Sequence, residues 1–283
     1  MRTLGSFIFA LLLSGALLGQ AAQSVPQTVV ITSGNLRLKA FLWMPTGPGP
    51  VPAVLFNHGS GGADAAHTAG MPITEAAEKL APLFLKHGYA FLYLFRRGQG
   101  LSADQAPFMR EILQREEGAK GKEASQHLQF VLLTTEQLDD VMAALTFLKT
   151  VPGIDSHHIA VAGHSFGGQL TLFAAERDST VRAAVTFAAA ANSWERSPEL
   201  RERLLTAVRK TSASIMLIQA TNDYSTAPGR ALAEELDRLH KPHLLKILPP
   251  VGRTPDDGHN ALYEAVPQWE DDVFKFLDEY VRP

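Results

Sequence analysis

The sequence predicts an α/β fold, namely a doubly wound, mostly parallel sheet with helices on both faces. Short apolar runs alternate with longer stretches of helical periodicity through most of the chain. These runs are continuously apolar, which is typical of parallel strands that are buried on both faces. Glycine-rich or polar segments directly follow several of them, so candidate functional loops are expected at the carboxyl edge of the sheet.

The first 21 residues differ from the rest of the chain. Arg2 gives a positive start, residues 7–18 are apolar, and Gly19-Gln20-Ala21 is a small-x-small cleavage site. A membrane anchor is the alternative, but the apolar run is shorter than the roughly 20 residues that span a bilayer. We therefore expect a signal peptide at 1–21, a single domain at 22–283, no stable membrane insertion and a periplasmic or extracellular location.

The mature chain begins with an expected antiparallel hairpin and then alternates between strands and helices. Strand-like residues 29–32 and 36–44 flank Ser33-Gly34-Asn35, which has turn chemistry. A Gly/Pro-rich linker then leads into the third strand. The later expected strands are 53–57, 90–95, 159–162, 183–187, 215–219 and 244–248; the expected helices are 75–86, 135–149, 167–176, 229–239 and 269–281. Gly88 is expected to end the first helix.

Two segments, 102–129 and 192–211, interrupt this alternation and predict small lid-like insertions. The first is polar and is expected to break at Gly118 and Gly121. Their larger apolar side chains either form a wall of the cleft or pack against the body of the protein; these are Phe108, Met109 and Trp194.

Composition excludes several classes of function. A net charge of −3 gives no electrostatic case for binding nucleic acid. The chain has no cysteine, which excludes disulfides and thiolate metal sites. We expect a small-molecule substrate, with no metal and no cofactor; the composition does not indicate an oligomeric state.

The strongest motif is Gly163-His164-Ser165-Phe166-Gly167, which joins an apolar strand to a helical pattern. In that context GxSxG predicts a nucleophile elbow, a strained turn that exposes the Ser165 hydroxyl above the strand ends. The motif also occurs by chance, so the strand and helix on either side are what support this interpretation.

A serine nucleophile needs a histidine base and a carboxylate that orients the histidine. His259 and Asp223 each follow an expected strand, so both are predicted at the same sheet edge as Ser165. Asp223 could instead cap the next helix. Asp256 and Asp257 compete for its role, but they share a loop with His259 and would have to reach backward.

An oxyanion hole needs two convergent backbone N–H groups. Phe166 is expected to supply one, because it follows the nucleophile, and Ser60 in His58-Gly59-Ser60-Gly61-Gly62 the other. A phosphate cradle is the alternative for this loop, but it lacks the lysine and Ser/Thr of a P-loop. His58 and His164 are expected to shape loops.

From residue 36 onward the chain resembles the α/β-hydrolase superfamily, in particular its dienelactone hydrolase-like and prolyl-oligopeptidase-like branches. The resemblance rests on these motifs: Asn57-His58-Gly59, Phe95-Arg96-Arg97-Gly98-Gln99-Gly100, Gly163 to Gly168, Asn222-Asp223 and Gly258-His259. It implies the α/β-hydrolase fold, the triad order Ser, Asp, His and no dissociable cofactor. Dienelactone hydrolases proper use a cysteine nucleophile, which this chain lacks. Arg96 and Arg97 either bind a substrate carboxylate at the rim or serve as structural or solvated charges.

Together these patterns predict a serine hydrolase that cleaves a carboxylic ester or related acyl bond through an acyl-enzyme. A serine peptidase of the prolyl-oligopeptidase-like type is the first alternative. A non-catalytic binding protein on the same scaffold is the second.

Overall fold

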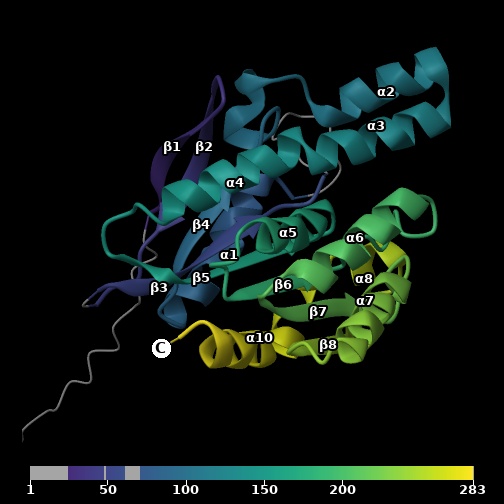
Figure 1. The fold of residues 1–283 in the computed structure, drawn as a ribbon. Helices are drawn as coiled ribbons and strands as arrows, with labels where there is room; N and C mark the ends of the chain where they lie inside the picture. Colours follow the sequence, from purple (N-terminus) through teal and green to yellow (C-terminus); the bar gives the residue numbers. More distant parts are fainter. Residues whose placement is uncertain (1–24, 48, 61–70, 283) are drawn as a thin grey trace, which may run out of the picture.

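A computed structural model of this protein describes residues 25–47, 49–60 and 71–282. The expected signal peptide and the glycines Gly61 and Gly62 lie outside these residues, so the signal peptide stays a prediction. Within the described chain, eight strands form one sheet in the order β1-β2-β4-β3-β5-β6-β7-β8 (Figure 1). The strands are β1 (Gln27–Ser33), β2 (Leu36–Trp43), β3 (Val51–Asn57), β4 (Ala90–Leu94), β5 (Ile154–His164), β6 (Ala183–Phe187), β7 (Ser214–Ala220) and β8 (His243–Leu248).

Strand pairing confirms the predicted mixed, mostly parallel sheet. β1 and β2 form the expected antiparallel hairpin around Gly34, whose φ of 56° suits the tight turn. β2 also pairs antiparallel with β4, whereas every later pair is parallel. The strands from β3 to β8 therefore end at one common edge.

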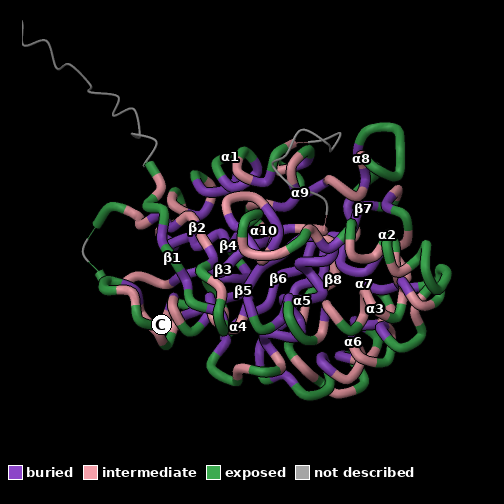
Figure 2. Tube along the Cα trace, turned by 90° about the horizontal axis from the view of Figure 1, so that it is seen from above, coloured by how far each residue is buried: buried purple, intermediate pink, exposed green. Residues whose placement is uncertain are grey.

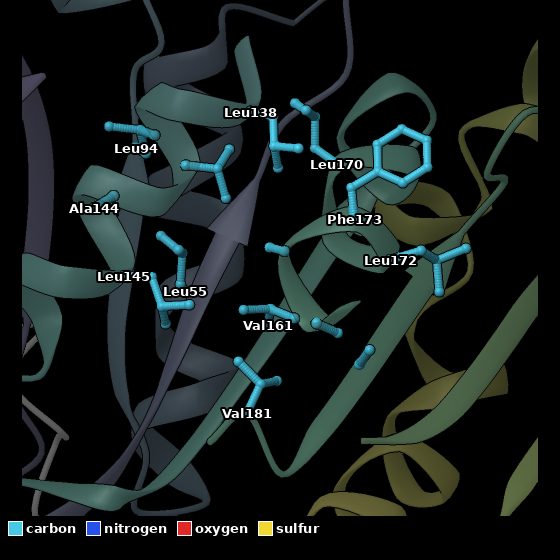
Figure 3. Close-up of a cluster of buried hydrophobic side chains, with 14 of the residues drawn as sticks. Leu55, Leu94, Leu138, Ala144, Leu145, Val161, Leu170, Leu172, Phe173 and Val181 are labelled. Atoms are coloured by element: carbon cyan, nitrogen blue, oxygen red, sulfur yellow. The ribbon is translucent and has the colours of Figure 1, made fainter. Parts of the chain in front are cut away.

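Helices cover both faces of the sheet, and each layer encloses its own core. α1, α9 and α10 pack on one face, while α4, α5, α6 and α7 pack on the other (Figure 2). On the second face, Leu138 and Leu145 of α4 and Phe173 of α5 meet strand residues Leu55 and Val161 (Figure 3). The helices that the structure describes are α1 (Ile73–Lys86), η1 (Gly100–Gln105), α2 (Met109–Lys120), α3 (Lys122–Thr134), α4 (Glu136–Leu148), α5 (Phe166–Arg177), α6 (Pro198–Lys210), α7 (Ala227–Arg238), α8 (Pro255–His259), α9 (Ala261–Glu264) and α10 (Val266–Tyr280).

The first insertion is a helical hairpin, α2–α3, that projects from the body of the protein (Figure 1). The chain turns at Gly121, where φ is 90°, as expected. The break expected at Gly118 is wrong, because this glycine lies inside α2. A single glycine in an exposed helix costs only about 1 kcal/mol relative to alanine, too little to end it.

The second insertion contains α6, which Ser197 caps by accepting a hydrogen bond from the Leu200 N–H at 3.2 Å. Trp194 and Met109 are buried in the core, so these two side chains pack against the body of the protein. β5 begins at Ile154, earlier than expected, because polar His157 and His158 interrupt its apolar pattern. In the described residues, no helix has both the length and the apolar character to cross a membrane.

Candidate active site

Loops from three parallel strands meet at the carboxyl edge of the sheet. Ser165 follows β5, Asp223 follows β7, and His259 ends the short helix α8 that comes after β8. Parallel pairing aligns these strand ends, since Gly163 lies beside Asn57 and Ala220 lies beside Leu248. The sequence-predicted site residues are therefore brought together from positions far apart in the chain.

The turn at Ser165 has the strained geometry of an elbow. Its φ of 54° and ψ of −117° lie outside the regions that L-residues usually adopt. Gly167 allows this turn, because a Cβ there would lie 2.0 Å from the carbonyl oxygen of Asn57. The Ser165 N–H donates to the Phe187 carbonyl at 2.8 Å, which fixes the turn to β6. The hydroxyl is held at the N-terminus of α5, where free N–H groups and the helix dipole favour negative charge.

Ser165, His259 and Asp223 form a continuous chain of hydrogen bonds. His259 Nε2 lies 2.9 Å from Ser165 Oγ, and His259 Nδ1 lies 2.8 Å from Asp223 Oδ1. Asp223 Oδ1 also accepts from the Tyr224 N–H at 2.7 Å. Burial raises the pKa of the Asp223 carboxyl, while its hydrogen bond with His259 acts in the opposite direction. Asp223 does not cap the next helix, because Thr226 occupies the N-cap of α7.

The competing acids have other contacts. Asp257 forms a capping box with Thr254 at the start of α8, and Asp256 bonds to the Tyr224 hydroxyl. Within the described chain neither forms a hydrogen bond with His259, so Asp223 is the only one of the three carboxylates that partners it there.

Asn222 forms a clamp, not evident from the sequence, between the loops that carry Asp223 and His259. Asn222 Nδ2 donates to the carbonyls of Val251 and Thr254 at 2.8 and 2.9 Å, and Asn222 Oδ1 accepts from the Val251 N–H at 2.9 Å. Gly258 packs directly on this asparagine, since a Cβ there would lie 2.6 Å from the Asn222 carbonyl carbon. Asn222 thus fixes Asp223 and His259 relative to each other.

His164 contacts the backbone of His259. Its Nε2 lies 2.8 Å from the backbone carbonyl of His259 and donates to it. Burial, together with the neighbouring His259, lowers the pKa of His164 to about 3, so its ring is neutral at ordinary pH. His58 is also buried, with a pKa well below its usual value, and its Nδ1 contacts the Gly59 carbonyl at 2.7 Å. Both histidines shape loops, as expected.

The predicted oxyanion donors lie beside Ser165. Phe166 begins α5, so its N–H has no acceptor within the helix. Gly59 lies close to Ser165, since a Cβ on it would lie 3.5 Å from Ser165 Cβ. Ser60 lines the same cavity as Ser165 and Phe166, and no described residue accepts a hydrogen bond from its N–H.

Neither of the two arginines that follow β4 lines the cavity beside Ser165. Arg97 pairs bidentately with buried Asp140, at 2.9 Å from Nε to Oδ2 and 2.7 Å from Nη2 to Oδ1. Arg96 is fully buried and donates to the Gly59 carbonyl. The structure therefore supports an internal, structural role for both arginines over binding of a substrate carboxylate at the rim.

Ser165 opens into a cavity of about 720 Å³. Its walls come from the edge of the sheet and from both insertions, and many of the lining side chains are polar. Among them are Arg110, Gln129, Gln169, Asn192, Arg196 and Tyr224. Trp194 and Phe108 are not among the lining residues, so neither forms a wall of this cavity. In the described residues, no three His, Asp or Glu side chains are grouped so that they could hold a metal ion.

Known proteins resemble this chain in sequence and fold. A quorum-quenching protein, AidA, from Acinetobacter baumannii is 27% identical over 172 residues, which cover 60% of this chain and 46% of AidA. The chain therefore spans less than half the length of that relative. A dienelactone hydrolase from Anabaena variabilis superposes with a TM-score of 0.61 and 22% identity, covering 91% of this chain and 99% of its own. The acylaminoacyl peptidase of Pyrococcus horikoshii gives 0.64 and 18%, over 92% of this chain and 42% of its own.

At these identities the two solved structures show the fold alone, which is that of the α/β-hydrolases. The sequence profile of the dienelactone hydrolase family matches residues 38–254, well over half of the chain's 283 residues. The chain belongs to the dienelactone hydrolase family.

Proposed function

We propose that this hydrolase cleaves carboxylic esters, with Ser165 as nucleophile, His259 as general base and Asp223 as the carboxylate that orients the histidine. The observation that carries the proposal is the unbroken hydrogen-bond chain from Ser165 Oγ through His259 to Asp223, at 2.9 and 2.8 Å. Ser165, the first residue of this chain of hydrogen bonds, lies at a strained elbow and lines a cavity, where a substrate could reach a nucleophile.

In the proposed reaction, His259 Nε2 takes the proton of Ser165 as Oγ attacks the ester carbonyl. Asp223 holds Nδ1–H and stabilises the imidazolium that forms. The N–H groups of Phe166 and Ser60 bind the oxyanion. His259 then protonates the leaving alcohol, and an acyl group stays on Ser165 until water, activated by the same histidine, releases it.

Two facts favour an ester over a peptide. The family's name denotes a lactone, which is a cyclic ester. The match covers only 42% of the acylaminoacyl peptidase that this chain resembles in fold. The likeness therefore gives no support for peptidase features that lie in the rest of that protein. The cavity's polar lining further favours acyl or alcohol groups that form hydrogen bonds.

The test is hydrolysis of 4-nitrophenyl esters from acetate to octanoate, δ-valerolactone and a matched 4-nitroanilide. Ser165→Ala is compared with Ser212→Ala; Ser212 is exposed and, among the described residues, donates only to the Ser179 carbonyl. We expect ester hydrolysis to fall by about 10⁴-fold or more in the first variant and to be retained in the second.

The other outcomes separate the alternatives. Hydrolysis of the anilide at a rate close to that of the esters would favour a peptidase. A wild-type protein that hydrolyses none of these compounds and is not labelled by an organophosphonate would be a binding protein, and the proposal would be wrong.

A further inference from the structure

Arg96 is a fully buried arginine just beyond the end of β4, beside the oxyanion loop. Its Nε donates to Gln137 Oε1 at 3.0 Å, and its Nη2 donates to the Gly59 carbonyl at 3.0 Å. Its guanidinium carbon also lies 5.6 Å from the centre of the Phe166 ring. The same side chain therefore contacts residues on both arms of the proposed oxyanion hole.

The charge of Arg96 has no direct counter-ion in the described chain. The neighbouring Arg97 pairs with both oxygens of Asp140 and also contacts Glu136, whereas Arg96 forms no ion pair with a carboxylate of the described residues. Burial lowers the pKa of Arg96 to about 10, against smaller opposite effects of nearby groups that include Asp140. Burying a charge without a counter-ion is costly, so its retention here calls for a function that uses the charge or its geometry.

The contacts of the Gly59–Ser60 peptide bond indicate such a function. Arg96 Nη2 and His58 Nδ1 both bind the Gly59 carbonyl oxygen, at 3.0 and 2.7 Å. In a trans peptide the C=O and the following N–H point in opposite directions, and the next N–H belongs to Ser60. Holding the carbonyl toward Arg96 therefore turns the Ser60 N–H away from it. Ser60 lines the cavity beside Ser165, and no described residue accepts from this N–H.

We propose that Arg96 is the positioning residue of the oxyanion hole, which grips the Gly59 carbonyl so that the Ser60 N–H is aimed at the developing oxyanion. This inference rests on the proposed function, and it assigns Arg96 a part in the reaction without contact with substrate. A cation on the carbonyl also polarises the peptide, which makes its N–H a stronger donor. Preorganised donors of this kind cost no reorganisation during the reaction.

The test compares the two adjacent arginines. Arg96→Gln and Arg96→Lys are measured beside Arg97→Gln, with thermal unfolding to confirm that each variant is folded. Kinetics on 4-nitrophenyl acetate are combined with inhibition by 1,1,1-trifluorohexan-2-one, whose carbonyl accepts Ser165 Oγ and becomes an oxyanion. The corresponding alcohol, 1,1,1-trifluorohexan-2-ol, forms no such adduct and reports ground-state binding.

We expect Arg96→Gln to lower kcat by about 10- to 100-fold, less than the 10²- to 10³-fold loss of a whole donor. Affinity for the trifluoromethyl ketone should fall by the same factor, while alcohol binding changes less than about two-fold. Arg96→Lys should recover only part of the loss, because lysine keeps the charge without the planar fork. Arg97→Gln should lower the unfolding temperature and leave kcat and ketone affinity unchanged.

If the Arg96 variants do not fold, Gln137→Met is the second variant. It removes the acceptor of Arg96 Nε, frees the guanidinium to shift, and is expected to weaken ketone affinity about three- to ten-fold without weakening alcohol binding. The inference is overturned if the folded variants bind the ketone like wild type, or if ketone and alcohol affinities fall together. A wild-type protein that neither hydrolyses the ester nor binds the ketone overturns the proposed function and this inference with it.

Discussion

Buried neutral histidine makes the stability of this protein sensitive to acid. His164 has its pKa lowered to about 3 by burial, with a smaller effect of His259, whereas in the unfolded chain it returns to its usual value near 6.5. Between these values the unfolded state binds a proton that the folded state does not, so the free energy of unfolding falls as pH falls. Integrated from about pH 8 to about pH 5, this single group accounts for about 2 kcal/mol of lost stability. His58 is shifted in the same direction and adds to the loss.

The assay is urea unfolding at about pH 8 and about pH 5, for wild type and His164→Gln. Glutamine keeps an N–H that can reach the His259 carbonyl but removes the titration, so the difference in unfolding free energy between the two pH values should shrink by about 2 kcal/mol. Tyr263→Phe is the matched control, since Tyr263 packs edge-on against the same ring. This substitution should lower the free energy of unfolding equally at both pH values. An unchanged pH difference in His164→Gln would refute the reasoning.

Two further predictions concern the reaction. Asp223→Asn should lower kcat by about 10⁴-fold, because the amide favours the wrong tautomer of His259. Asp155→Asn, which alters a second His–Asp contact of 2.7 Å at the opposite end of β5, should leave kcat unchanged, and equal losses in the two variants would contradict the assigned roles. Arg110 and Arg196 line the cavity, and in the described chain neither has a carboxylate partner. The 4-nitrophenyl monoester of adipate should therefore have about a ten-fold higher kcat/KM than the hexanoate ester, and Arg110→Gln with Arg196→Gln should abolish the preference; equal rates in wild type would exclude a role for these charges.

Periodicity and turn chemistry were enough to predict the elements of this sheet and the residues at its edge. Apolar runs such as 183–187 became buried parallel strands, and the turn at Gly34 set the only hairpin predicted. The positions of Ser165, Asp223 and His259 followed from one rule, that loops after parallel strands share an edge. Their hydrogen bonds could not follow from that rule, because a separation of 94 residues between Ser165 and His259 is closed only by the fold.

The supporting contacts were harder to predict because they connect distant loops through backbone atoms. Asn222 donates to backbone carbonyls 29 and 32 residues away. Every residue has a backbone carbonyl, so the sequence does not show which carbonyls accept these hydrogen bonds. Arg96 and Arg97 are identical in type and adjacent in sequence, yet one faces Asp140 and the other Gly59. Both arginines lie in the loop beyond the end of β4, where strand alternation no longer determines the direction of a side chain.

In the proposed mechanism, two buried charges lie where charge of the opposite sign develops. His259 becomes a cation during attack, and Asp223 lies 2.8 Å from its Nδ1. The substrate carbonyl becomes an anion, and Arg96 lies behind the Gly59–Ser60 peptide that would receive it. Each charge is costly to bury in the resting protein and is best compensated in the transition state, which is the condition for electrostatic catalysis. Neutralising either one should therefore lower kcat more than it weakens binding of substrate.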